Sequence, residues 1–211
     1  MNKIRILLVD DHPALRMGLA LLLNGEPDMA VVGEARSGEE AVEMFAARQP
    51  DISLMDLRMG SMSGVHAIQT IRASFPTARI IVLTSYDRDE DVYQSLRAGA
   101  MAYLLKETPY EEIASAIRTV HSGRRHFPSR ISEKLAERMA MPDLNERELD
   151  ILRLMSCGLS NKEIAAELSV AVGTVKYYIN SILTKLNAED RTQAVIKGVK
   201  RGLVELTEPG P

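Results

Sequence analysis

The sequence of 211 residues is poor in cysteine, with Cys157 alone, and this scarcity excludes an intramolecular disulfide. A single thiol fits the reducing cytoplasm, where we expect this chain to reside. Long apolar runs are also lacking, so we expect no membrane association. The first apolar run stops early, at Asp10-Asp11, which argues against a signal peptide. The four histidines show no metal-ligand spacing, and we interpret them as surface or capping residues.

Net charge is small, at −3, but its sign is unevenly distributed along the chain. Residues 1–122 carry 12 basic and 17 acidic side chains, whereas residues 144–211 carry nine of each. Within the last part, residues 171–201 hold six basic side chains against only Glu189 and Asp190. This local basic surface indicates a polyanionic partner more clearly than the total charge does.

Five short apolar runs in the first half, each followed by a helix-like segment, are typical of an α/β domain with a doubly wound five-stranded parallel sheet. The runs are Ile4–Val9, Met29–Glu34, Asp51–Met55, Ile80–Leu83 and Met101–Leu105. Parallel strands point the same way, so the residues that end them converge at one edge of the sheet. That edge would gather Asp10, Asp11, Asp56, Thr84 and Lys106.

This set of polar residues has the chemistry of a phosphoryl-accepting site. The carboxylates of Asp10, Asp11 and Asp56 suit a hard divalent ion such as Mg²⁺. A carboxylate can also be the nucleophile that forms an acyl phosphate, and Asp56 is the candidate. Lys106 would then balance phosphoryl charge, and the Thr84 hydroxyl would hydrogen-bond to the phosphoryl group. A lone Asp after a strand is usually a helix N-cap, so it is the whole set that favours a functional site.

The second half of the chain has a different organisation. Residues 123–143 break the strand-helix pattern, and we interpret them as a linker containing one helix, from Ser129 to Met139. From Asn145 onward there are no strand signals, and Asn145, Ser160 and Asp190 look like helix starts. A helix over 172–186 follows a short turn, which predicts an all-α helix-turn-helix domain.

Residues 1–122 resemble the receiver domain of bacterial two-component response regulators, which has a flavodoxin-like fold. The resemblance implies that Asp56 is the phospho-acceptor, assisted by Thr84 and Lys106, and that Thr84 and Tyr103 form the switch. It further implies that Mg²⁺ is held by Asp10, Asp11, Asp56 and the main-chain carbonyl of Arg58. Gly60 departs from the family pattern, which has proline there, and a glycine frees the backbone beside the site.

Residues 144–211 resemble the DNA-binding domain of the LuxR-type (NarL/FixJ) subfamily, through Gly158-Leu-Ser-Asn-Lys-Glu-Ile-Ala165 and Thr174-Val-Lys176 above all. The resemblance implies that the helix over 172–186 lies in the major groove of double-stranded DNA. The side chains facing base edges would be Lys176, Tyr177 and Asn180. Those positioning the phosphate backbone would be Asn161, Lys162, Thr174, Lys185 and Arg191. Tyr178 stands where the subfamily usually has His, so the preferred DNA sequence stays open.

We therefore expect a transcription regulator, not an enzyme, whose DNA binding depends on phosphorylation of Asp56 by a sensor histidine kinase. The balanced charge of residues 144–211 predicts homodimers on paired promoter half-sites. The last helix offers four residues either for a dimer face or for the core, namely Ala194, Val195, Val199 and Leu203.

Two alternatives compete with this expectation. In the first, DNA binding is independent of phosphorylation, and the receiver is only a dimerisation module. In the second, the chain is a phosphohydrolase with Asp56 as its nucleophile, although the sequence offers no evident element of a substrate pocket.

Overall fold

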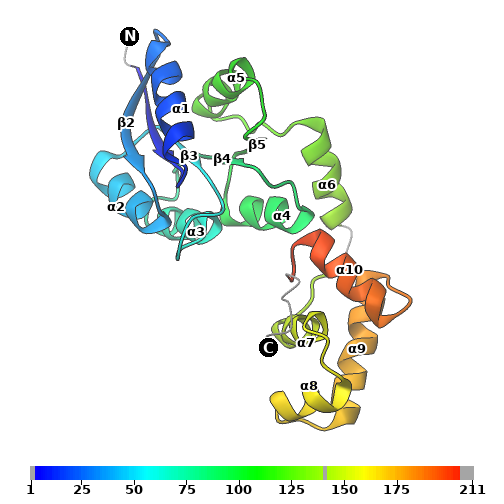
Figure 1. Cartoon of the computed structure of the whole chain (residues 1–211). Coiled ribbons are helices and arrows are strands. Elements are labelled where there is room, and N and C mark those ends of the chain that lie inside the picture. Colours follow the sequence, from blue (N-terminus) through cyan, green and yellow to red (C-terminus); the bar gives the residue numbers. More distant parts are fainter. Residues whose placement is uncertain (1–2, 140–141, 205–211) are drawn as a thin grey trace. The chain divides into compact units, whose positions relative to one another are not determined.

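The computed structural model describes residues 3–139 and 142–204 (Figure 1). The chain divides into two compact units, one of residues 1–87 and 92–133, the other of residues 134–211 with 88–91. Each unit has its own hydrophobic core. Among the described residues, no helix is long and apolar enough to span a membrane.

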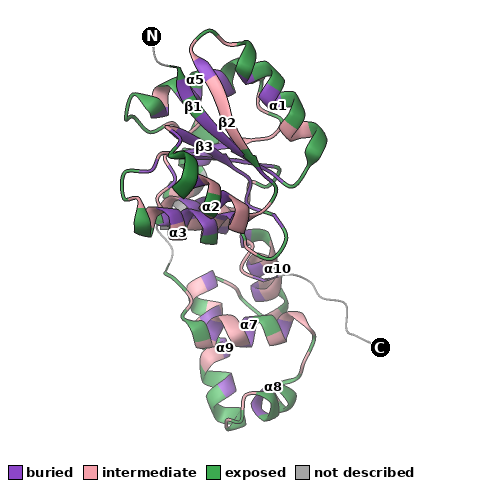
Figure 2. Ribbon diagram, turned by 90° about the vertical axis from the view of Figure 1, so that its left-hand side faces the viewer, coloured by how far each residue is buried: buried purple, intermediate pink, exposed green. Residues whose placement is uncertain are grey.

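A parallel sheet of five strands forms the centre of the first unit. Its strands are β1 (Ile4–Val9), β2 (Met29–Ala35), β3 (Ile52–Met55), β4 (Ile80–Thr84) and β5 (Ala102–Leu105). They are arranged in the order β2-β1-β3-β4-β5, and every neighbouring pair is parallel. Figure 2 shows that β1 and β3 are buried almost throughout. This burial explains why their sequences are nearly continuous apolar runs rather than alternating ones. The predicted doubly wound sheet is confirmed.

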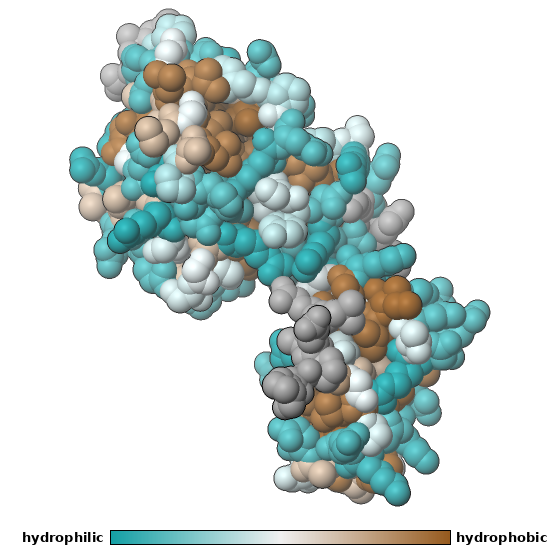
Figure 3. Space-filling model, in the orientation of Figure 1, coloured by the Kyte–Doolittle hydropathy of each residue, from teal (hydrophilic) through white to brown (hydrophobic). Residues whose placement is uncertain are grey.

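Five helices alternate with these strands and cover both faces of the sheet (Figure 1). They are α1 (Pro13–Gly25), α2 (Gly38–Arg48), α3 (Gly64–Ser74), α4 (Asp89–Ala98) and α5 (Tyr110–His121). Leu19 and Leu23 of α1 pack with Ile113 and Ile117 of α5 in one core, so these two helices share a face. The residues of α1 that remain exposed include the apolar Met17, Leu21 and Leu22. Figure 3 shows that hydrophobic surface is present on this unit among the hydrophilic residues.

The linker helix α6 spans Ser129–Met139, as the sequence predicts. The first unit extends to Glu133 and therefore includes the first turn of α6. Just before this helix, His126 makes an isolated parallel bridge to Ala102 of β5. The linker thus begins as part of the first unit.

The second unit is helical, with α7 (Glu146–Ser156), α8 (Asn161–Glu167), α9 (Val172–Leu186) and α10 (Arg191–Arg201). Gly158, after α7, has φ of 81°, and Ser169, between α8 and α9, has φ of 52°. The core gathers apolar side chains from all four helices. The four residues that the sequence leaves open between core and dimer face lie in or against this core, and Ile196 is the large apolar residue that α10 exposes.

Candidate functional site

The ends of β1, β3, β4 and β5 bring the predicted acidic set together at one edge of the sheet. Asp10 directly follows β1, Asp56 follows β3, Thr84 ends β4 and Lys106 follows β5. Asp10, Asp56 and Thr84 are all buried, whereas Asp11 is exposed. Burial of charged groups is costly unless they are paired, so the site needs an internal cation.

Lys106 supplies that cation. Its Nζ lies 2.7 Å from Oδ2 of Asp10 and 2.6 Å from Oδ2 of Asp56. Partial burial acts to lower the pKa of the ammonium, but the hydrogen bonds and charges of both aspartates outweigh it and raise the pKa above its ordinary value. Lys106 therefore stays protonated and holds the two carboxylates together at neutral pH.

The carboxylate of Asp56 is fixed at both oxygens. Oδ1 accepts hydrogen bonds from the backbone amides of Leu57, at 2.6 Å, and Arg58, at 3.5 Å, while Oδ2 accepts one from Lys106. An oriented carboxylate of this kind has one oxygen polarised by amides and one neutralised by an ammonium. Such an arrangement favours a single direction of attack on an incoming electrophile.

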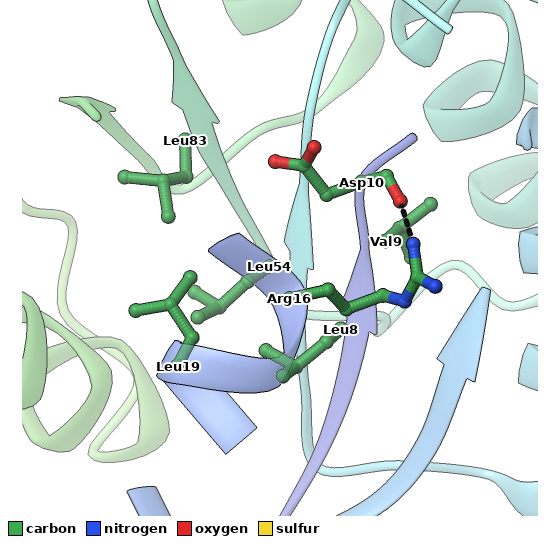
Figure 4. Close-up of a pocket in the computed structure, with 7 residues that line it drawn as sticks. All are labelled: Leu8, Val9, Asp10, Arg16, Leu19, Leu54 and Leu83. Carbon is green, nitrogen blue, oxygen red and sulfur yellow. Dashed lines mark hydrogen bonds between the residues drawn. The ribbon is translucent and has the colours of Figure 1, made fainter. Parts of the chain in front are cut away.

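The backbone around Asp10 is fixed by a second cation. Arg16, from α1, donates a hydrogen bond of 2.6 Å to the main-chain carbonyl of Asp10. Figure 4 shows this bond and, around it, leucines from β1, α1, β3 and β4. The carboxylate of Asp10 points away from the guanidinium in this view, which leaves it available to Lys106.

Four side chains could hold a metal ion at this edge. Ligand atoms of Asp10, Asp11, His12 and Asp56 all lie within 4.8 Å of one another. Carboxylate oxygens are the ligands that Mg²⁺ prefers, so the donor set fits that ion. His12, interpreted from the sequence only as a surface or capping residue, belongs to this cluster, because its Nδ1 lies 2.8 Å from Oδ1 of Asp11. The signal that could have identified His12 is its place in the sequence, directly after Asp10 and Asp11.

Thr84 carries a polar atom for which the described part of the chain provides no partner. Its side chain is fully buried, and Oγ1 makes no hydrogen bond to any described residue. A buried hydroxyl without a partner is unfavourable, and such groups are rare in folded proteins. The unpaired hydroxyl at the end of β4 is therefore available to donate a hydrogen bond to a group that binds at the acidic edge.

Tyr103 and the β4–α4 loop lie next to this edge. Tyr103 is fully buried, and its hydroxyl donates a hydrogen bond of 2.7 Å to the main-chain carbonyl of Tyr86. The guanidinium of Arg58 lies 5.2 Å from the centre of the Tyr86 ring, within range for a cation–π contact. Through Tyr86, the β4–α4 loop thus contacts both β5 and the β3–α3 loop.

The β3–α3 loop has a conformation that its glycines permit. Gly60 has φ of 41°, which proline, with φ fixed near −65°, does not adopt. A Cβ on Gly64 would lie 2.0 Å from the carbonyl oxygen of Asp56, so α3 can begin against the site only with glycine there. Ser61 anchors the loop by donating a hydrogen bond of 2.6 Å to Glu39 of α2.

In the helical unit, the exposed side of α9 carries the residues predicted to face DNA bases. Lys176, Tyr177 and Asn180 are all exposed, Tyr177 by 70% of its surface, while Val175 and Ile179 are buried. Tyr178 is half-buried against the core, and its ring lies 5.5 Å from that of Tyr177.

The residues predicted to contact phosphates fall into two groups. Lys162 and Thr174 are exposed, and Asn161 is half-buried at the start of α8. Lys185 and Arg191 instead have partners inside the unit.

Lys185 belongs to a buried polar network. Its Nζ lies 2.7 Å from Oε2 of Glu148, and Ser181 donates a hydrogen bond of 2.6 Å to the other oxygen. Burial acts to raise the pKa of the Glu148 carboxyl, but the bonds from Lys185, Ser181 and the Asn145 amide outweigh it and lower the pKa. This network joins the start of α7 to the last turns of α9.

Arg191 makes a comparable contact at the start of α10. Its guanidinium donates hydrogen bonds to the carbonyl of Leu159 and to Oδ1 of Asn161. Burial lowers the pKa of Arg191 from its ordinary value. The sequence predicts Lys185 and Arg191 as phosphate contacts, and it did not identify their internal partners, which come from other segments of this unit.

Family models match both halves of the chain. Residues 6–118 match the response regulator receiver domain, and residues 142–197 match the luxR family of bacterial regulatory proteins. The transcriptional regulatory protein LiaR of Bacillus subtilis (strain 168) is 43% identical, over 95% of this chain and 99% of LiaR. The response regulator protein VraR of Staphylococcus aureus (strain NCTC 8325 / PS 47) is 39% identical, over 96% of this chain and 99% of VraR.

Solved structures agree with these matches. The response regulator ChrA of a heme-sensing two-component system aligns with a TM-score of 0.57 at 31% identity, over 96% of this chain and 100% of ChrA. RcsB from Salmonella enterica serovar Typhimurium, bound to a promoter in the presence of phosphomimetic BeF3⁻, aligns with a TM-score of 0.72 at 23% identity. That alignment covers 94% of this chain and 99% of RcsB, and shows likeness of fold.

Proposed function

We propose that this chain, which belongs to the two-component response regulators with a LuxR-type DNA-binding domain, binds promoter DNA under the control of phosphorylation at Asp56. The observation that carries the proposal is the environment of Asp56. Its buried carboxylate is fixed between Lys106 and two backbone amides, and the Thr84 hydroxyl on the neighbouring strand has no partner among the described residues.

In the proposed reaction, a carboxylate oxygen of Asp56 attacks the phosphorus of a phosphohistidine on a sensor kinase. An O–P bond forms as the P–N bond breaks, and the electron pair of that bond remains on the imidazole nitrogen of the kinase. Lys106 already contacts Asp56, so its ammonium is positioned to neutralise charge on the transferred group. The hydroxyl of Thr84 donates a hydrogen bond to a phosphoryl oxygen and gains the partner it lacks.

Asp10, Asp11, Asp56 and the main-chain carbonyl of Arg58 are the proposed ligands of Mg²⁺. The three carboxylates provide the hard oxygen donors, and the cluster also contains His12. If bound by these residues, Mg²⁺ would supply positive charge next to the phosphoryl group. Asp10 and Asp56 share Lys106 between them, so metal binding and the position of Lys106 are expected to influence each other.

Thr84 and Tyr103 are the proposed switch. Thr84 ends the strand that leads into Tyr86, whose carbonyl accepts the hydrogen bond from Tyr103. A shift of Thr84 toward a phosphoryl group would act on this short segment directly. The β4–α4 loop is therefore the element we expect to respond first.

The test of phosphorylation uses the full chain and its Asp56→Asn variant. Both are incubated with acetyl phosphate and Mg²⁺, and their intact masses are measured. A single phosphoryl adduct on the wild type alone supports the proposal. If neither protein gains an adduct, the alternative regulator, whose DNA binding does not depend on phosphate, is favoured instead.

For DNA recognition, we propose that Lys176, Tyr177 and Asn180 of α9 read base edges while Asn161, Lys162 and Thr174 contact phosphates. All except Asn161 are exposed. For Lys185 and Arg191 we propose a positioning role, because their cationic groups already bind Glu148, Leu159 and Asn161. The balanced charge of this unit favours binding as homodimers on paired half-sites, since one copy alone offers few phosphate contacts.

Substitution of single lysines separates these roles. DNA sites are first selected from random sequences by the phosphorylated protein. Lys162→Ala is then expected to weaken binding to all sites and to reduce the slope of log affinity against log salt by about 0.9. Lys176→Ala is expected to relax sequence preference. Lys200→Ala, at an exposed position of α10 outside the proposed surface, serves as the control and should change neither property.

A further inference from the structure

The β4–α4 loop is contacted from both of the segments expected to respond to phosphorylation. Tyr86 receives the hydrogen bond from Tyr103 of β5 through its carbonyl, and the guanidinium of Arg58 through its ring. Arg58 lies two residues after Asp56, in the loop that carries the proposed metal ligand. The next residue in the β4–α4 loop, Asp87, makes a contact of a different kind.

Asp87 forms an ion pair with Arg130, in the first turn of the linker helix α6. The guanidinium side chain is 66% exposed and the carboxylate side chain 30% exposed. Both residues belong to the first unit. The pair is therefore an interaction within this unit, between a loop of the proposed phosphorylation site and the segment that leads to the helical domain.

The same stretch of the linker is docked on the edge of β5. The amide of His126 donates a hydrogen bond of 3.0 Å to the carbonyl of Met101, and Ile131 is 3% exposed. A cavity of about 250 Å³ lies beside this contact, lined by Tyr103 and Leu105 on one side and by residues that include Pro128 and Ile131 on the other. In the described segment 126–131, the linker is thus held by the apolar side chain of Ile131, by the backbone hydrogen bond from His126 and by the Arg130 ion pair, over imperfectly packed surface. In addition, Nε2 of His126 lies 3.8 Å from a carboxylate oxygen of Glu112 of α5.

We propose that these contacts form a linker latch, made of the Asp87–Arg130 ion pair and the docked segment 126–131, which phosphorylation of Asp56 releases. The inference rests on the proposed function, because it uses Thr84 and Tyr103 as the switch. Movement of Thr84 toward a phosphoryl group displaces Tyr86 and Asp87, which follow it in the chain. Arg130 then loses its partner, and the first turn of α6 leaves the edge of β5.

The strength of the latch suits this role. Exposed ion pairs contribute little to stability, so the closed latch is only slightly more stable than the open one. A phosphorylation event that alters Thr84 and Lys106 can therefore overcome it. A fully buried salt bridge in the same place would instead lock the linker in both states.

Amide hydrogen exchange of residues 126–133, measured on the full chain by mass spectrometry, tests the latch directly. The amides of His126, Ile131 and Ser132 are all hydrogen-bonded in the docked segment. Without phosphate, Arg130→Glu is expected to raise the exchange rate of this segment about two- to fivefold, in keeping with the loss of an exposed ion pair. The swapped variant Asp87→Arg/Arg130→Asp restores opposite charges and should return the rate toward that of the wild type.

The matched control is Arg125→Glu, which makes the same charge change at an exposed linker residue outside the latch, and it should exchange like the wild type. Incubation of the wild type with acetyl phosphate and Mg²⁺ should raise exchange of residues 126–133 by a similar factor, with the adduct verified by mass in the same sample. Wild-type protein that carries the adduct yet exchanges no faster would overturn the latch while the proposed function stands. Absence of any adduct would count against the proposed function, and the phosphate-free variants would still decide the latch: equal rates in Arg130→Glu and wild type would reject it.

Discussion

The hydroxyl of Thr84 destabilises the unphosphorylated protein, and in the proposed function it would hydrogen-bond to the phosphoryl group. Its buried hydroxyl has no partner among the described residues, which costs free energy in the folded state. Thr84→Val replaces the hydroxyl by a methyl group of similar size. We expect the free energy of unfolding of the unphosphorylated receiver to rise by about 0.5–1 kcal/mol.

The same variant should lose its response to phosphorylation. Thermal unfolding of wild type and Thr84→Val, each with and without acetyl phosphate and Mg²⁺, measures both effects. The adduct mass is recorded in parallel, so that a change in labelling is separated from a change in stability. A Thr84→Val protein clearly less stable than the wild type before phosphorylation would show that the hydroxyl has a partner in the resting state.

Gly60 decides the path of the loop that follows the phospho-acceptor. Its φ of 41° lies in the left-handed region, and a Cβ added there meets no atom within 4 Å. Gly60→Ala should therefore cost only the backbone strain, about 1–2 kcal/mol. Gly60→Pro requires φ near −65°, so the loop has to adopt another path, and a larger loss is expected. The measurements are thermal unfolding and the rate at which acetyl phosphate labels Asp56.

The two Gly60 variants control for each other, since both restrict the backbone but only proline excludes the observed φ. Similar unfolding temperatures for Gly60→Ala and Gly60→Pro would mean that the loop does not depend on the left-handed conformation.

The helices and strands were largely predictable from the sequence, because the residues that determine each of them lie within it or directly beside it. The first strand and the helix over 172–186 follow the apolar pattern within their own segments, and Ser160 and Asn145 cap the helices they precede. The convergence of the acidic set at one edge also followed, since all the strands of a parallel sheet end at the same edge, although the strand order β2-β1-β3-β4-β5 decides which of those ends are neighbours.

Contacts between distant elements were not predictable in this way. Nothing in the neighbourhood of Lys185 signals that its ammonium binds Glu148, 37 residues away. The same holds for Arg130 and Asp87, 43 residues apart, and for the left-handed backbone of Gly60, where the family pattern has proline. These features depend on packing that a single sequence does not reveal.

The junction of α7 and α9 gives a prediction about pH. The pKa of the Glu148 carboxyl is below its ordinary value of 4.5 in the folded protein, through Lys185 and Ser181 chiefly. A lowered pKa stabilises the fold above the unfolded value, and this contribution is lost as pH falls through the folded value. We expect the helical domain to lose stability as pH drops below about 4.5, and Glu148→Gln to weaken that dependence.

Denaturant unfolding of the full chain at several pH values between 7 and the acid limit measures this effect. Glu163→Gln is the matched control, because Glu163 also closes a capping box but is exposed. At pH 7, Glu148→Gln leaves Lys185 facing an uncharged amide and should cost about 2–3 kcal/mol. An equal loss in both variants would show that capping, not the buried ion pair, sets the stability of this junction.

At the scale of the whole molecule, the two units have separate cores that share no residue. A substitution that alters the stability of one unit should then leave the stability of the other unit unchanged, as expected for independent sites. Thr84→Val and Glu148→Gln lie in different units and each alters a buried polar group. Scanning calorimetry of the full chain should resolve two transitions, with Thr84→Val shifting only one and Glu148→Gln only the other.

The double variant Thr84→Val/Glu148→Gln completes this test. Each of its two transitions should be shifted in temperature by as much as in the corresponding single variant. A single transition moved by either substitution would mean that the units unfold together, so that the linker transmits much more free energy than an exposed ion pair provides. The linker latch needs no such coupling between the units, because its ion pair and its docked segment both lie within the first unit, so two independent transitions are what it predicts.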